Sequence, residues 1–296
     1  MQLRILKYFL IVAREESFSK AAEVLHLTQP TLNRQITQLE EDLGVKLFER
    51  SKQRILLTKQ GQLYRRRAEE AVLIMNKAEE ELFQEEDTLE GTISFGCGEF
   101  MCNTILADAI MEFSQKYPLV KFEIFTGIAD TVKERMEHGL ADIGIFMEPV
   151  DVDKYSFIRF RKPEKWIVSM RADDPLSTKP YITKDDLLDK PLIMTWRAKL
   201  RKEIANWFGV DYERLNVKMN VNLNGNSILF AIKGFGYCIT LEGAHKLHNC
   251  PELVFKELYP PLTSRCVLAW TKDQPLNIAL QKFLEFFKEY LARTGN

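Results

Sequence analysis

The first 44 residues carry apolar side chains at the spacing of three consecutive helices. A first helix is expected over residues 3–14, where the inward positions are Leu6, Phe9, Leu10 and Ala13. A short second helix is expected after Ser17, whose hydroxyl suits an N-cap, and a third between Thr28 and Gly44. Their inward positions are Ala21, Ala22, Leu25, Leu32, Ile36, Leu39 and Leu43. The pattern predicts a small three-helix unit at the start of the chain.

The outer face of the third helix is polar. Its exposed positions are expected to be Gln29, Thr31, Asn33, Arg34, Thr37 and Gln38, with Pro30 in the first turn. Amides hydrogen-bond adenine edges, arginine binds guanine, and hydroxyls bind phosphates. Two helices joined by a tight turn, the second polar on its outer face, are typical of a DNA-binding helix-turn-helix. A three-helix unit with a merely solvated polar face is the alternative.

A basic hairpin is predicted directly after the third helix. Short strands are expected over residues 45–48 and 55–58, and the segment around the turn contains Arg50, Lys52 and Arg54. Such a hairpin is a wing, whose cations can lie along phosphates or in the minor groove. The charge distribution agrees, because residues 1–67 carry a net charge of +6 and residues 68–90 one of −8, in a chain of net charge −1.

These motifs resemble those of LysR-type transcriptional regulators. The matching runs are residues 18–22 (FSKAA), 27–32 (LTQPTL), 34–36 (RQI), 39–40 (LE), 43–50 (LGVKLFER) and 57–61 (LTKQG). The chain departs from the family at Asn33, where the family usually has serine. The resemblance implies a sequence-specific regulator that reads an inverted repeat in double-stranded DNA and works with RNA polymerase.

A long helix is predicted to follow, from a cap at Thr58 to about Asp87. Its intermittent apolar positions are Leu63, Ala71, Ile74, Ala78 and Leu82. The resemblance implies that two such helices pair antiparallel in a homodimer, and pairing through the rest of the chain would give a homotetramer. A solvated spacer helix is the alternative.

From residue 91 onward, predicted strands and helices alternate, which indicates parallel βαβ units. Strands are expected at residues 92–97, 120–125, 142–146, 166–170, 192–196 and 266–270, with a closing helix over 278–291. This part also resembles the LysR-type effector domain, itself similar to type 2 periplasmic binding proteins. The matching stretches are residues 113–118, 139–143, 173–176 and 234–236.

The expected fold class is therefore a multidomain α+β and α/β protein. A winged helix-turn-helix (1–58) is followed by a linker helix (59–90) and a two-lobed effector domain (91–296). Lobe I is expected to comprise residues 91–161 and 267–296, and lobe II residues 162–266, with a small-molecule effector bound between them.

Ligands of such sheets bind at the carboxyl ends of strands. The candidate effector contacts are Gly98, Glu99, Phe100, Thr126, Gly127, Met147, Glu148, Trp196, Arg197 and Asn224. Glu99 and Glu148 would repel an isolated anion, which favours an effector with an amine or neutral polar group and an apolar body. Arg197 could still bind one carboxylate, and the two glutamates could instead be solvated rim residues.

Composition restricts the other classes of protein. The chain is 46% hydrophobic and 28% charged, and no apolar run approaches the length of a membrane span. Lys7 and Arg14 interrupt the apolar start, so no signal peptide is expected and the protein is predicted to be cytoplasmic. Five widely spaced cysteines and four scattered histidines predict neither a disulfide framework nor a zinc-type cluster.

Three classes of function remain open from the sequence. The first is an effector-responsive transcription factor, the second an enzyme on the α/β body, and the third an architectural DNA-binding protein. No nucleophile–base pair or glycine-rich phosphate loop supports catalysis, so neither catalytic residues nor a cofactor is expected. An architectural role leaves the two-lobed body unexplained. Redox sensing through Cys97 and Cys102 is an additional alternative.

Overall fold

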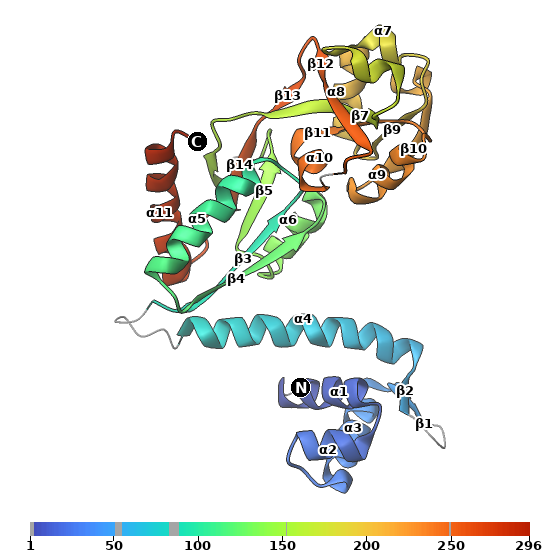
Figure 1. The fold of residues 1–296 in the computed structure, drawn as a ribbon. Helices are drawn as coiled ribbons and strands as arrows, with labels where there is room; N and C mark the ends of the chain where they lie inside the picture. Colours follow the sequence, from blue (N-terminus) through green and yellow to red (C-terminus); the bar gives the residue numbers. More distant parts are fainter. Residues whose placement is uncertain (1–2, 51–54, 83–88, 152, 249) are drawn as a thin grey trace. The chain divides into compact units, whose positions relative to one another are not determined.

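The computed structural model describes residues 3–50, 55–82, 89–151, 153–248 and 250–296 of the 296-residue chain. The chain forms two compact units, Met1–Phe83 and Gln84–Asn296 (Figure 1). No helix within the described ranges is both long and apolar enough to cross a membrane.

The first unit begins with the three expected helices, α1 (Leu3–Glu15), α2 (Phe18–Val24) and α3 (Gln29–Leu43). Ser17 caps α2, Thr28 caps α3, and Gly44 ends α3 with a φ of 67°. All three caps were expected from the sequence, because each position has the side chain or the freedom that a helix end requires. The helices enclose a core around Phe9, Leu32 and Ile36.

The wing starts later than the sequence predicts. Its strands are β1 (Phe48–Arg50) and β2 (Ile55–Leu57), which pair antiparallel, so residues 45–47 are not part of the ladder. The amide of Leu47 donates instead to the Glu40 carboxylate at 2.8 Å. A buried side chain from α3 thus satisfies the backbone where a strand partner was expected.

The long helix α4 (Lys59–Leu82) begins directly after Thr58, whose hydroxyl oxygen accepts from the amide of Gly61 at 2.9 Å. Gly61 lies in the first turn, where glycine weakens a helix. A Cβ there would lie 2.1 Å from the carbonyl oxygen of Leu47, so the close approach of α4 to the wing requires glycine. The last residues of the predicted helix, 83–87, lie outside the described residues.

The second unit contains a five-stranded sheet in the order β4-β3-β5-β14-β6, here named lobe I with its helices. Its strands are β3 (Gly91–Cys97), β4 (Val120–Thr126), β5 (Ile143–Met147), β6 (Tyr155–Arg159) and β14 (Cys266–Thr271). Helices α5 (Cys102–Lys116) and α11 (Ile278–Thr294) pack on one face, and α6 (Ala129–Glu137) packs on the other. Alternate residues divide between the faces, since Leu268 joins the α5–α11 core while Val267 and Ala269 contact the α6 cluster.

The other sheet, named lobe II with its helices, has the order β10-β9-β11-β7-β12-β8, with β13 paired to β7. Its strands are β7 (Glu164–Arg171), β8 (Ile182–Thr183), β9 (Leu192–Thr195), β10 (Val217–Val221), β11 (Tyr237–Leu241), β12 (Leu253–Tyr259) and β13 (Thr263–Ser264). Its helices are α7 (Lys184–Leu187), α8 (Ala198–Phe208), α9 (Gly225–Ile232) and α10 (Glu242–His248), with 3-10 turns at Pro175–Thr178 and Tyr212–Arg214.

The sheets are mixed rather than wholly parallel. β3 runs parallel to β4 and β5, whereas β14 runs antiparallel to both β5 and β6. In lobe II, β7 runs antiparallel to both β11 and β12. The chain leaves lobe I between β6 and β7 and returns between β13 and β14. Cys266, which the expected bounds give to lobe II, pairs with Met147 in the lobe I sheet.

Candidate nucleic-acid interface and ligand cleft

Most of the predicted DNA contacts on the outer face of α3 are exposed to solvent. Gln29, Pro30, Arg34 and Gln38 are exposed, whereas Thr31 and Asn33 are half-buried. The second face of the helix is buried through Leu32, Ile36 and Leu39, which fixes the direction of the polar face. The surface near the amino-terminal end of α3 therefore has the composition that base edges and phosphates require.

Several predicted contacts already have partners within the winged helix-turn-helix (residues 1–58), here named the head. The side-chain oxygen Oε1 of Gln29 accepts from the Ser19 hydroxyl at 3.1 Å, and Nε2 of Gln38 donates to the Asp42 carboxylate at 2.9 Å. Arg34 has neither a hydrogen bond nor an ion pair among the described residues. Its guanidinium is exposed on α3 and can bind a guanine edge or a phosphate without first breaking an internal bond.

The wing contacts are only partly described. Lys52 and Arg54 lie outside the described residues, and Arg50 is placed only by its backbone in β1, opposite Ile55. Their contact with phosphates remains an expectation from the sequence.

A buried carboxylate joins α3, the candidate recognition helix, to the wing. Glu40 accepts from the amides of Leu47 and Phe48 at 2.8 and 3.1 Å, and from Lys46 Nζ at 2.8 Å. Burial opposes ionisation, but the hydrogen bonds from Lys46 and the two amides outweigh it and lower the pKa of Glu40. Sequence analysis did not identify this role, and only its place in the matching run marked the residue.

We expect Glu40→Gln to destabilise the head by about 2 kcal/mol, because two buried amides lose a charged acceptor. Since the folded-state pKa is lowered, this stabilisation is present above the unfolded-state pKa and is lost as the pH falls through the folded-state pKa. Hydrogen exchange of peptides spanning residues 29–49 measures the change at neutral and acidic pH. The exposed neighbour Glu41→Gln is the control, and equal protection in the two variants at neutral pH would contradict this role for Glu40.

A cleft lies between the two lobes of the second unit. The volume of the cleft that no atoms occupy is about 550 Å³, and part of it is open to solvent. It is lined by Gly98, Glu99, Phe100, Gly127, Ile128, Ala129, Met147, Trp166, Thr195, Arg197, Leu200, Val221, Asn222, Leu223, Asn224, Ile239, Thr240 and Leu241. Most of these side chains are apolar, with a few polar groups among them, as in sites that bind small organic molecules.

Seven of the ten candidate effector contacts line this cleft, namely Gly98, Glu99, Phe100, Gly127, Met147, Arg197 and Asn224. Glu148 and Trp196 line an adjoining, wider hollow together with Met147 and Arg197. Thr126 lies elsewhere, in a hollow of lobe I beside α5. It is the last residue of β4, and strand alternation turns its side chain away from the cleft that the following Gly127 lines.

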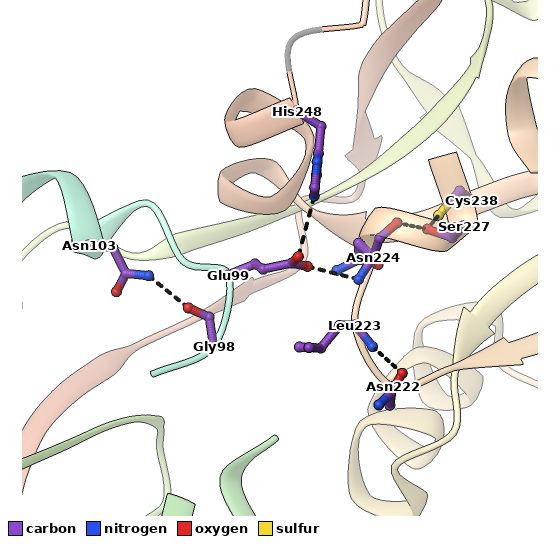
Figure 2. Close-up of polar contacts among 9 residues, drawn as sticks. All are labelled: Gly98, Glu99, Asn103, Asn222, Leu223, Asn224, Ser227, Cys238 and His248. Atoms are coloured by element: carbon purple, nitrogen blue, oxygen red, sulfur yellow. Dashed lines mark hydrogen bonds and ion pairs between the residues drawn. The ribbon is translucent and has the colours of Figure 1, made fainter. Parts of the chain in front are cut away.

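Glu99 connects the two lobes across the cleft (Figure 2). Its carboxylate accepts from the amide of Asn224 at 2.8 Å, at the start of α9, and lies 3.3 Å from His248 Nε2 of α10. Only 13% of the Glu99 side chain is exposed. The carboxylate of lobe I therefore satisfies the amino-terminal end of a lobe II helix, where an external anion would otherwise be attracted.

Glu148 is also engaged, since its carboxylate accepts from Arg159 Nε at 2.7 Å. Both glutamates that are expected from the sequence to repel an isolated anion are therefore hydrogen-bonded within the protein. Arg197, by contrast, lines the cleft and its guanidinium has no partner among the described residues. The helices α6 and α8 both start at the cleft without a side-chain cap, which adds positive potential there.

Other lining residues were not predicted from the sequence. Thr240 lines the cleft, and its buried hydroxyl oxygen has no hydrogen-bond partner in the described part of the chain. Trp166 lines the cleft from β7, and its indole N–H donates to the Ser264 hydroxyl oxygen at 3.0 Å. Both residues lie inside strands, so no loop signal distinguishes them from core residues.

The fold and these two surfaces define a DNA-binding protein with a helix-turn-helix head and a ligand-binding body of two lobes. Residues 3–62 match the bacterial regulatory helix-turn-helix proteins of the lysR family, and residues 86–292 match the LysR substrate binding domain. The chain belongs to the LysR family of transcription regulators. It is a DNA-binding regulator with an effector-binding domain rather than an enzyme.

Relatives align along nearly the whole chain. The uncharacterized HTH-type transcriptional regulator YvbU of Bacillus subtilis is 28% identical over 98% of both chains. The HTH-type transcriptional regulator BsdA of the same organism is 28% identical over 97% of this chain and all of its own. Full-length CbnR, solved in complex with its target DNA, shares the fold with a TM-score of 0.75 at 18% identity over 98% of this chain and 100% of its own.

Proposed function

We propose that the cleft binds a small organic acid with an apolar body and that this ligand controls DNA binding by the head. The observation that supports it most is Arg197, a cation that lines the cleft without a partner among the described residues. The uncapped starts of α6 and α8 add to its attraction for one anionic group. Apolar side chains such as Phe100, Leu223 and Ile239 would contact the rest of the ligand.

This proposal replaces the amine that the sequence favours. An amine would need a carboxylate that is not already engaged, whereas Glu99 accepts from the Asn224 amide on one oxygen and lies 3.3 Å from His248 Nε2 with the other. Glu148 is likewise paired with Arg159. Thr240 would donate or accept one further hydrogen bond to a polar substituent of the acid.

Calorimetry of the full-length chain against matched carboxylic acids, their amides and their amines tests the proposal. We expect an acid to bind and Arg197→Gln to weaken it roughly 10- to 100-fold, the effect of losing a charge-assisted hydrogen bond. Lys199→Gln removes the same charge from the adjoining hollow and should leave the affinity unchanged. Binding of an amine that is lost in Glu99→Gln and kept in Arg197→Gln would overturn the proposal.

We further propose that the regulator is a homodimer that reads an inverted repeat, or a homotetramer built from two such dimers. α4 packs on α1 through Tyr64, Ala68 and Val72, and exposes Leu73, Ile74 and Met75 elsewhere on its surface. Exposed apolar residues on a 24-residue helix are typical of a helix that pairs with another copy. Two heads related by a twofold axis would contact two half-sites, in the cytoplasm where DNA and RNA polymerase are found.

A further inference from the structure

Three residues far apart in the sequence meet where the chain passes between the lobes. Cys102 is the first residue of α5, Glu164 the first of β7, and Cys266 the first of β14. All three are at most 3% exposed. The two sulfur atoms and a carboxylate oxygen all lie within 4.8 Å of one another. None of these residues lines the ligand cleft.

The carboxylate in this cluster is only half satisfied. Glu164 Oε1 accepts from the amide of Cys102 at 3.0 Å, whereas Oε2 is buried and has no hydrogen-bond partner among the described residues. A buried oxygen without a partner costs about 1–3 kcal/mol, so a native fold that retains one needs a reason.

We propose that Cys102, Glu164 and Cys266 bind one divalent ion that has a filled d shell and accepts sulfur ligands, such as Zn²⁺. Two sulfurs and one oxygen form a ligand set that such ions accept, at about 2.3 Å for sulfur and 2.0–2.2 Å for oxygen. Ligand atoms within 4.8 Å of one another approach a common ion after small side-chain movements. Each cysteine releases its thiol proton to solvent as the sulfur–metal bond forms, and the carboxylate binds as the anion.

Charge also favours the site. Two thiolates, one carboxylate and a divalent cation leave a net charge of −1, at the amino-terminal end of the 15-residue helix α5. The positive end of the helix dipole and the amide of Cys102 stabilise that charge. The fourth position of a tetrahedral ion would be taken by water or remain unfilled.

The ion would fix the angle between the lobes. Cys102 and Cys266 belong to lobe I. Glu164 is the first residue of β7 in lobe II, where it pairs with Ser264 of β13. Metal bonds to all three would tie both crossing segments to α5. The site would therefore stabilise one relative position of the lobes independently of any ligand in the cleft.

Redox sensing by the neighbouring pair Cys97 and Cys102 has less support. Cys97 and Cys102 are only 4% and 3% exposed, whereas an oxidant needs access to the sulfur atom. Cys97 is not part of the cluster and lies at the end of β3. It therefore serves as a matched control for the metal site.

Titration of the reduced, metal-free full-length chain with Zn²⁺ against a chromogenic chelator tests the proposal. We expect one ion per chain, and replacement by Co²⁺ should give thiolate-to-cobalt charge-transfer absorption. Cys102→Ser and Cys266→Ser should each weaken binding by at least about a hundredfold, beyond the effect of losing an indirect contact. Cys97→Ser and the half-buried Cys250→Ser should bind as the wild type does.

Glu164→Gln keeps the shape of the side chain and covers the case in which a cysteine variant does not fold. It should lower the Zn²⁺ affinity about tenfold or more while DNA binding by the head is retained. Wild-type affinity in Cys102→Ser or Cys266→Ser, absence of the cobalt absorption, or an unchanged Glu164→Gln would each overturn the proposal.

Discussion

Arg34→Ala is expected to weaken binding to the selected operator roughly 10- to 100-fold and to relax base preference at one position of each half-site. The side chain is exposed on α3 and has no internal partner to release. A bidentate contact to a base edge accounts for about 1–3 kcal/mol of discrimination. Gel-shift titrations on the operator and on its single-base variants measure both effects.

Arg54→Ala is the contrasting variant for this prediction. As a wing residue it is expected to weaken binding to all sequences by a similar factor and to reduce the salt slope by about 1. The opposite pattern, with base preference lost in Arg54→Ala and kept in Arg34→Ala, would show that the recognition helix and the wing have been assigned wrongly.

Gly243→Val is expected to abolish tight ligand binding in the cleft without touching the ligand. Gly243 lies in α10 of lobe II, and a Cβ there would be 2.2 Å from the amide nitrogen of Met101 and 2.5 Å from the carbonyl carbon of Phe100. Both atoms are lobe I backbone, so the contact between α10 and the start of α5 must open. A cost of about 3 kcal/mol, the upper end for overpacking, corresponds to about a hundredfold loss of affinity.

Calorimetry with the tightest acid of the panel checks the Gly243 prediction. Lys246→Val is the control, because it places the same side chain in α10 at an exposed position. An affinity in Gly243→Val within about threefold of the wild type would show that close contact of the lobes at α10 is not needed for binding.

Local sequence signals predicted the head well. Ser17, Thr28 and Gly44 set the helix ends in the structure as they do in the sequence pattern. A cap depends on the few residues around it, so its signal is present in the chain itself. The start of β1 could not be predicted in this way, because it depends on a carboxylate seven residues earlier folding back onto Leu47.

The body was predicted less completely for the same physical reason. β6, β10 and β12 were not expected, although Val217, Met219 and Val221 of β10 alternate with polar residues as in a half-buried strand. Their positions follow from pairing with β14, β9 and β7, contacts between distant segments. The antiparallel direction of β14 likewise depends on its pairing with β5 and β6, which lie far away in the sequence.

Most of the cleft candidates were predicted correctly from their positions at strand ends, but their electrostatic roles were not predicted. Glu99 is a cleft residue in both accounts, yet its carboxylate is engaged by Asn224, far along the chain. The cluster of Cys102, Glu164 and Cys266 was missed entirely, since wide spacing in the sequence carries no sign of proximity in space. Interactions across lobes depend on the complete fold, and single-sequence patterns do not encode them.

We expect a ligand in the cleft to control how the heads bind DNA. The most direct measurement is a footprint of the full-length protein on an operator selected from a random DNA pool, with and without the acid identified by calorimetry. We expect two half-sites in an inverted repeat, and a ligand-dependent change in occupancy or extent that Arg197→Gln shifts to higher ligand concentration. A footprint that stays the same in the wild type at saturating ligand would contradict the claim.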